Sequence, residues 1–232
     1  KARRRRQRYR RLYDGHPLVA VSRGVADDLR RQLELVSPIV TIPNPFDPQQ
    51  IRALAGENAR LPTAPYVLHV GRFAPQKRHD LLLDAWQRIS LPHKLVLLTE
   101  PEPRLTAMIA ERGLADRVLI AGFRRNPYPW FARAALLVLC SDHEGLPNVL
   151  LEALACGTPV LSTDCPSGPA EILAALPQCL VPCGDAAILA DRLEALVRCP
   201  PEVANFDLTP YAPATVAAAW ANLAAAGASG GH

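Results

Sequence analysis

Short apolar runs alternate with longer amphipathic stretches along most of the chain. The short runs are apolar at nearly every position and not at every second one, which is typical of parallel strands covered on both faces. We expect strands at Leu18–Ser22, Tyr66–Val70, Lys94–Thr99, Val118–Ala121, Leu136–Cys140, Pro159–Ser162 and Leu180–Val181.

The amphipathic stretches between these runs have the period of α-helices. They lie at Asp80–Ile89, Arg104–Arg112, Pro129–Ala134, Pro147–Cys156, Ala170–Leu176 and Ala186–Arg198. Pro147 suits the first position of a helix and Gly157 the position just past its end, while Asp185 is a good N-cap. The alternation of strand and helix predicts an α/β fold with a doubly wound, mostly parallel, Rossmann-like sheet.

Composition divides the chain into segments. The stretch containing IPNPFDPQQ and NARLPTAP is rich in proline and weakly periodic, which favours a linker. The predicted segments are the end of a preceding domain with a basic helix and a last βα unit at 1–42, an interdomain linker at 43–64, a sheet domain at 65–200, and a return helix with a tail at 201–232. Because the chain begins with lysine and Met108 is its one methionine, we interpret it as a piece of a longer protein.

The net charge of +4 is concentrated at the N-terminus. Residues 1–11, KARRRRQRYRR, carry eight positive charges, and the rest of the chain has 18 basic against 22 acidic residues. The body is therefore mildly acidic, which argues against a general nucleic-acid-binding domain. We interpret the basic run first as the solvated end of a helix. Contact of Arg3–Arg11 with an anionic membrane surface is the main alternative, and nucleic acid is the least favoured partner.

The sequence shows no features of a membrane-spanning, secreted or metal-binding protein. No apolar run approaches the roughly 18 residues of a membrane span, and no signal peptide is visible. The six cysteines form no CxxC pair, and the histidines and cysteines lack the spacing of a metal site. We therefore expect a reduced cytoplasmic protein without a metal ligand set.

Three polar segments follow predicted strands. GRFAPQK follows YVLHV, GFRRNPYPW follows RVLIA, and SDHEGLPN follows LLVLC. Because ligands bind at the carboxyl ends of strands in open α/β sheets, we expect these segments to form one site. No GxGxxG, GxxxxGKS or GxxxxGKT pattern occurs, which argues against a standard dinucleotide site and a P-loop.

The chemistry of these segments suits an anionic, hydroxyl-rich ligand. Arg72 offers a planar fork and Lys77 a mobile point charge, a pair suited to a diphosphate. The segment Gly145–Asn148 opens a helix, whose free amides and dipole favour an anion. Glu152 lies on the polar side of that helix, and a carboxylate accepts hydrogen bonds from sugar hydroxyls. Each side chain alone could be an ordinary surface charge, but together they indicate a nucleotide-sugar.

GRFAPQK, GFRRNPYPWFARA and SDHEGLPNVLLEALACGTPVLSTD together resemble the C-terminal, donor-binding half of a family 4 glycosyltransferase of GT-B fold. The E-x7-E spacing of Glu144 and Glu152 is that family's mark. With DCPSGPAEIL after it, the segment is similar to bacterial enzymes that build lipopolysaccharide, capsule or other surface glycans.

The resemblance implies retaining transfer of a hexose-type sugar from a nucleoside diphosphate sugar, with UDP favoured, to a lipid-linked or surface glycan acceptor. It implies no cofactor and no metal, and a cytoplasmic location, peripheral on the inner membrane if Arg3–Arg11 meet lipid. The acceptor would bind through a further N-terminal domain, so this piece alone is not expected to turn over.

By the same resemblance, Arg72 and Lys77 bind the diphosphate and stabilise the leaving group. Glu144 sits against the donor sugar without acting as a nucleophile, and Glu152 accepts from the ribose hydroxyls. Backbone of residues 122–126 would hold the base. The predicted site residues are Gly71, Arg72, Lys77, Gly122, Phe123, Arg124, Asn126, Glu144, Gly145, Leu146, Pro147, Asn148 and Glu152.

One departure and two alternatives qualify this interpretation. After KLVLL the family often has a glycine-containing turn, whereas this chain has TEPEP. A basic-tailed module that binds membrane or nucleic acid through residues 1–11 is one alternative. A nucleotide-sugar epimerase of GT-B fold is the other.

Overall fold

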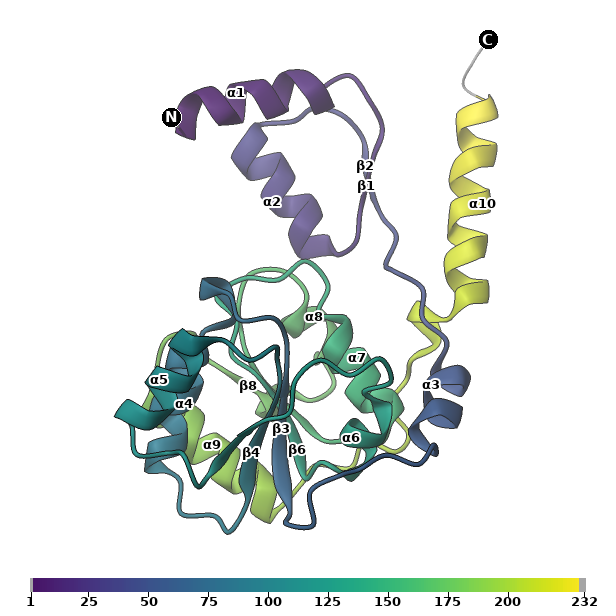
Figure 1. The fold of residues 1–232 in the computed structure, drawn as a ribbon. Coiled ribbons are helices and arrows are strands. Elements are labelled where there is room, and N and C mark those ends of the chain that lie inside the picture. The colour runs from purple at the N-terminus through teal and green to yellow at the C-terminus, as the bar shows by residue number, and fades with distance from the viewer. Residues whose placement is uncertain (1, 230–232) are drawn as a thin grey trace.

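The main sheet has six parallel strands (Figure 1) in a computed structural model that describes residues 2–229. The strands are β3 (Tyr66–Val70), β4 (Lys94–Leu98), β5 (Val118–Ile120), β6 (Leu136–Leu139), β7 (Val160–Thr163) and β8 (Leu180–Val181). Their order is β5-β4-β3-β6-β7-β8, so the chain runs outward from β3, returns beside it and runs outward again. This order confirms the predicted doubly wound, Rossmann-like fold class.

Helices cover both faces of the sheet. α4, α5 and α9 pack together, and α3, α6 and α7 form a second group. The helices are α3 (Pro48–Ala55), α4 (His79–Arg88), α5 (Pro103–Glu111), α6 (Tyr128–Arg133), α7 (Asn148–Ala155), α8 (Pro169–Ile172) and α9 (Ala186–Arg198), with short 3-10 turns η1 (Pro75–Lys77), η2 (Pro177–Cys179) and η3 (Thr209–Tyr211). All six predicted helices are present, but the one predicted at Ala170–Leu176 ends at Ile172, and Pro147 is the N-cap of α7 and not its first helical residue. As expected, Asp185 caps α9 through the amides of Ala187 and Ile188, and Gly157 adopts a positive φ just past α7.

Helix α3 lies within the proline-rich stretch that the sequence marks as a linker. Its N-cap, Asp47, accepts hydrogen bonds from the amides of Gln49 and Gln50 at 2.9 and 3.1 Å. Ile51 enters the main core. An eight-residue helix has little stability of its own, so this cap and the packing against α6 and α7 are what stabilise it. The prolines around it hide its pattern in the sequence.

Residues 2–42 form a smaller N-terminal unit. It contains α1 (Ala2–Tyr13), β1 (Leu18–Ala20), α2 (Arg23–Leu33) and β2 (Ile39–Thr41). β1 and β2 pair in parallel over a small apolar cluster of their own. The strand β2 is not among the predicted elements, because three residues are too few to show a period.

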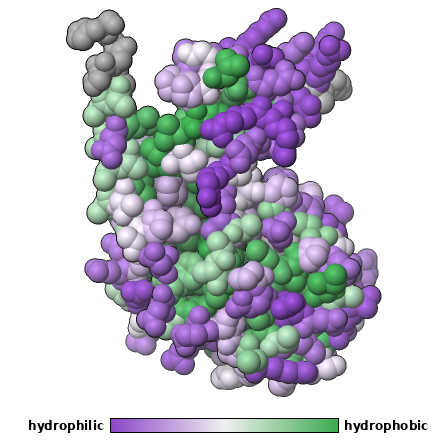
Figure 2. All heavy atoms as spheres, turned by 180° about the vertical axis from the view of Figure 1, so that it is seen from behind, coloured by the Kyte–Doolittle hydropathy of each residue, from purple (hydrophilic) through white to green (hydrophobic). Residues whose placement is uncertain are grey.

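The C-terminal helix α10 (Pro213–Ser229) stands away from the sheet and rises beside the N-terminal unit (Figure 1). On this helix Val216 is buried and Trp220 is half exposed. Seen from behind, hydrophilic side chains gather over α1, whereas α10 is pale to green (Figure 2). The end of the predicted tail, residues 230–232, lies outside the described residues.

Candidate functional site

The strand order reverses between β3 and β6, and the crevice above such a switch point is where open α/β sheets bind ligands. Two loops rise there: residues 71–77 after β3, which we call the cationic turn, and residues 141–148 after β6. The amide of Asp142 donates to the carbonyl of Gln76 at 2.8 Å and ties the loops together. Of the three segments predicted to converge, these two are therefore in contact.

Lys77 and Glu144 form the centre of the site. Lys77 Nζ lies 2.6 Å from Glu144 Oε1, and the hydroxyl of Ser141 donates to the same oxygen at 2.6 Å. Both side chains are mostly buried, with exposed fractions of 16% for Lys77 and 11% for Glu144. Only Oε1 is engaged by described residues, so Oε2 and two of the ammonium protons remain for a ligand.

The cationic turn is anchored from below. The hydroxyl of Thr99, the first residue of TEPEP, donates to the carbonyl of Gly71 at 2.5 Å. At the far end of the turn, Arg78 has a positive φ and binds Asp80 and Asp142, and these hydrogen bonds raise its pKa. Arg72 is exposed and has no hydrogen bond or ion pair with the described residues, so its guanidinium is free to meet an anion.

Two buried histidines lie under this turn. Their rings meet edge to face, with centroids 4.8 Å apart, and His69 Nδ1 lies 3.0 Å from the carbonyl of Val138. Burial lowers the pKa of His69 to about 4 and that of His79 to about 3, so both are neutral at physiological pH. The two neutral rings therefore add no positive charge near Lys77.

Glu152 occupies the polar side of α7. The leucines of this helix, at 150, 151 and 154, are buried as predicted, and Glu152 itself is half-buried. Within residues 2–229 its carboxylate has no hydrogen bond or ion pair, and burial raises its pKa. A desolvated carboxylate without a partner is costly, and hydroxyl donors from a ligand would compensate it.

At the start of α7, Pro147 is buried and Asn148 is exposed. Gly145 and Leu146 precede them and are partly covered. The predicted phosphate-facing segment thus lies at a helix N-terminus beside Glu144.

The segment after β5 is more open. Gly122 has a positive φ, and Phe123 is 70% exposed. The Arg124 guanidinium lies over the ring of Trp130, 5.4 Å from its centroid. This leaves an aromatic ring and a planar cation at the surface where a base was predicted.

The side chain of Asn126 links two segments of the chain, a role that the sequence did not indicate. Its side-chain amide donates to the carbonyl of Leu54 at 2.9 Å and to Glu57 at 2.8 Å, and its oxygen accepts from the amide of Tyr128 at 3.1 Å. The side chain therefore ties α3 to α6, and only its backbone is left for a ligand.

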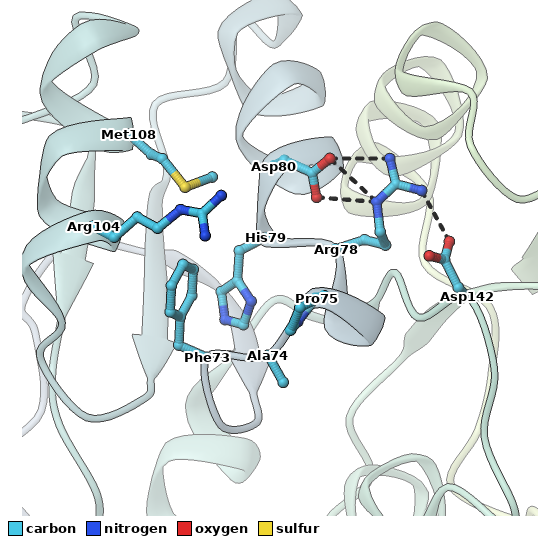
Figure 3. A pocket seen from close by; sticks show the side chains of 9 residues that line it. All are labelled: Phe73, Ala74, Pro75, Arg78, His79, Asp80, Arg104, Met108 and Asp142. Carbon is cyan, nitrogen blue, oxygen red and sulfur yellow. Dashed lines mark hydrogen bonds and ion pairs between the residues drawn. The ribbon is translucent and has the colours of Figure 1, made fainter. Parts of the chain in front are cut away.

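A cavity of about 400 Å³ is lined in part by Phe73, Ala74 and Pro75 of the cationic turn (Figure 3). Arg104 and Met108 of α5 face Phe73 and His79 across it, and the Arg78 ion pairs form one wall. No predicted site residue lines this cavity.

Among residues 2–229, no three His, Cys, Asp or Glu side chains are grouped so that they could hold a metal ion. No helix in the same range is long and apolar enough to cross a membrane.

Residues 64–199 match the family model described as glycosyl transferases group 1. The chain is 40% identical over 109 residues to N-acetylgalactosamine-N,N'-diacetylbacillosaminyl-diphospho-undecaprenol 4-alpha-N-acetylgalactosaminyltransferase from Campylobacter jejuni, covering 46% of this chain and 30% of that protein. Across four curated relatives, the match spans between 27% and 45% of their length.

Solved structures share the fold. Sucrose-phosphate synthase from Thermosynechococcus elongatus superposes with a TM-score of 0.79 at 23% identity, covering 95% of this chain and 61% of that one. Anabaena HepE in complex with UDP and glucose gives a TM-score of 0.71 at 20% identity, covering 90% and 62%. The family match confirms the resemblance carried by the three loops: the chain belongs to the group 1 glycosyl transferases, and its fold is one half of GT-B.

Proposed function

We propose that this chain is the donor-binding part of a retaining glycosyltransferase that uses a nucleoside diphosphate sugar, with UDP as the favoured nucleotide. The sugar is of the hexose type, and the acceptor is a lipid-linked or surface glycan. The observation that carries the proposal is the Lys77–Glu144 pair at the switch point, together with the exposed Arg72 in the same cationic turn, whose guanidinium has no partner among the described residues. The UDP complex of HepE supports the choice of nucleotide by similarity of fold alone.

In this proposal the chemistry is electrostatic. Arg72 and Lys77 meet the negative charge that develops on the departing diphosphate, which is the usual largest contribution in such transfers. Lys77 is held in place by Glu144 before the donor arrives, so little reorganisation is needed. Glu144, through its free Oε2, accepts from a hydroxyl of the donor sugar, and no metal or cofactor is required.

The rest of the donor follows the two flanking segments. Glu152 accepts from the ribose hydroxyls, and the backbone around Gly122–Asn126 holds the base. Residues 144–148 form what we call the donor loop, in which Gly145–Asn148 bind the phosphates or sugar. The acceptor glycan binds through a further N-terminal domain. We place the enzyme in the cytoplasm, and the exposed basic side chains of α1 would hold it to an anionic inner-membrane surface.

A thermal-shift screen of UDP, GDP and ADP without added metal tests the proposal. A ligand that binds only the native state stabilises it by about 2.7 kcal/mol at 100 times its dissociation constant. We expect UDP to raise the melting temperature saturably, and Arg72→Ala to abolish the shift. If no nucleotide shifts the melting temperature at millimolar concentration, the proposed function is wrong.

A further inference from the structure

The segment DCPSGPAEIL lies against α2 of the N-terminal unit, and none of its residues belongs to the proposed donor site. Both carboxylate oxygens of its Glu171 accept from the start of α2: Oε2 from the amide of Arg23 at 2.9 Å and Oε1 from the amide of Gly24 at 2.7 Å. The first amides of a helix lack partners within it and carry a partial positive charge, so a carboxylate there is stabilised twice. Here the carboxylate comes from the other unit of the molecule.

A second bond joins the same helix end to the donor loop. Ser22, the N-cap of α2, accepts from the amide of Val25, and its hydroxyl donates to the carbonyl of Gly145 at 2.8 Å. Ser22 is 2% exposed, so this bond between the units is shielded from water. The end of α2 is therefore bonded both to Glu171 and to the donor loop.

Residues 166–168, which we call the 166–168 turn, pack closely between the start of α2 and the donor loop. A Cβ on Gly24 would lie 2.7 Å from Ser167 Cα, and a Cβ on Gly168 would lie 2.4 Å from Pro147 Cδ. Neither glycine can therefore carry a side chain without moving its neighbour. α2, the 166–168 turn and the donor loop form one continuous stack.

We propose that Glu171 and Ser22 are positioning residues that form a latch between α2 and the donor loop. When the latch opens, the carbonyl of Gly145 loses its partner. The 166–168 turn also loosens, and its Pro166 carbonyl accepts from the amide of Glu144 at 3.2 Å. The shape of the donor loop thus depends on where the N-terminal unit sits. The role of the latch in catalysis rests on the proposed donor function of that loop.

Residue-resolved hydrogen exchange on the whole chain tests the latch without any ligand. In the wild type we expect protected amides at Arg23 and Gly24. Glu171→Gln should speed their exchange at least about tenfold, equivalent to about 1.4 kcal/mol, and should also speed exchange in the donor loop. Glu111→Gln is the matched control, because Glu111 is exposed and its carboxylate has no hydrogen bond or ion pair with described residues.

Gly24→Ala provides a second, chemically different perturbation. Alanine is the better helix former, so α2 itself should be favoured, yet the new methyl group pushes against Ser167 Cα. We expect faster exchange in the donor loop in this variant too, although no charge is lost. Because coupling is reciprocal, UDP should slow exchange at Arg23 and Gly24 in the wild type, and both variants should bind UDP several-fold more weakly.

Two results would overturn the latch. One is rapid exchange at Arg23 and Gly24 in the wild type. The other is loosening in Glu171→Gln that stops at α2 and leaves the donor loop at the wild-type rate. Faster exchange at both α2 and the donor loop in Glu171→Gln, together with a wild type that binds no nucleotide, would contradict the proposed function and support the latch.

Discussion

Glu152→Gln separates a ligand-binding carboxylate from a surface one. The substitution keeps the shape of the side chain and removes its charge and one acceptor. In the unliganded protein Glu152 has no partner among the described residues, and burial raises its pKa. We therefore expect opposite effects of the substitution on nucleotide affinity and on stability.

The loss of affinity follows from the hydrogen bonds to ribose. A hydrogen bond to a charged group contributes about 1.5–3 kcal/mol, so UDP should bind about 10- to 150-fold more weakly. Stability should change the other way. Because the folded-state pKa of Glu152 is raised, the stability that its protonated form contributes is present below the unfolded-state pKa. That stability is lost as the pH rises through the folded-state pKa. At neutral pH the glutamine variant should therefore unfold at a slightly higher temperature.

Isothermal titration calorimetry with UDP and 2′-deoxy-UDP measures the first effect. The deoxy nucleotide should bind the wild type more weakly and lose less on substitution, which isolates the contact from general damage. Equal dissociation constants for wild type and variant would refute the assignment of Glu152 to ribose. A drop in melting temperature would contradict the account of an unpartnered, desolvated carboxylate.

Three further outcomes are expected. Lys77→Met should lower the free energy of unfolding by about 1.5–3 kcal/mol, because it leaves the mostly buried Glu144 carboxylate without its cation. Arg72→Ala should change the free energy of unfolding by no more than about 0.5 kcal/mol. Urea titrations measure both. The unfolding free energy should fall as the pH drops from about 6.5 to about 4, because the buried histidines have lowered pKa values, and His79→Gln should flatten this slope. Replacing the α1 arginines by glutamine should abolish flotation with anionic vesicles, and unchanged binding in high salt would contradict an electrostatic contact.

Continuous apolar runs were enough to predict the strands of the sheet, and amphipathic periodicity was enough to predict most of its helices. The runs Tyr66–Val70 and Ala186–Arg198 coincide with β3 and α9, because burial on both faces of a strand and one face of a helix leaves a clear pattern. The strand β2 has three residues, too few to show a pattern, and the helix α3 lies in a proline-rich stretch, where its cap and its packing against α6 and α7 decide it. The predicted domain boundaries stay a prediction.

The part of the candidate site that lies at the ends of strands was predictable from the sequence. Parallel strands bring their following loops to one edge, so the approach of Lys77 to Glu144 could be expected. The partners that hold those side chains could not, since Ser141 and Thr99 act through a single hydroxyl whose direction no spacing reveals. The same holds for Asn126, whose side chain serves the scaffold.

The paired strands β1 and β2 stand alone as a two-stranded sheet among the described residues. Each strand then keeps one row of backbone donors and acceptors without a strand partner, and Val40 beside this row is exposed. Such open edges are templates for further strands. At high concentration this piece of chain should therefore associate edge to edge with other copies, unless another strand of the protein covers the open side.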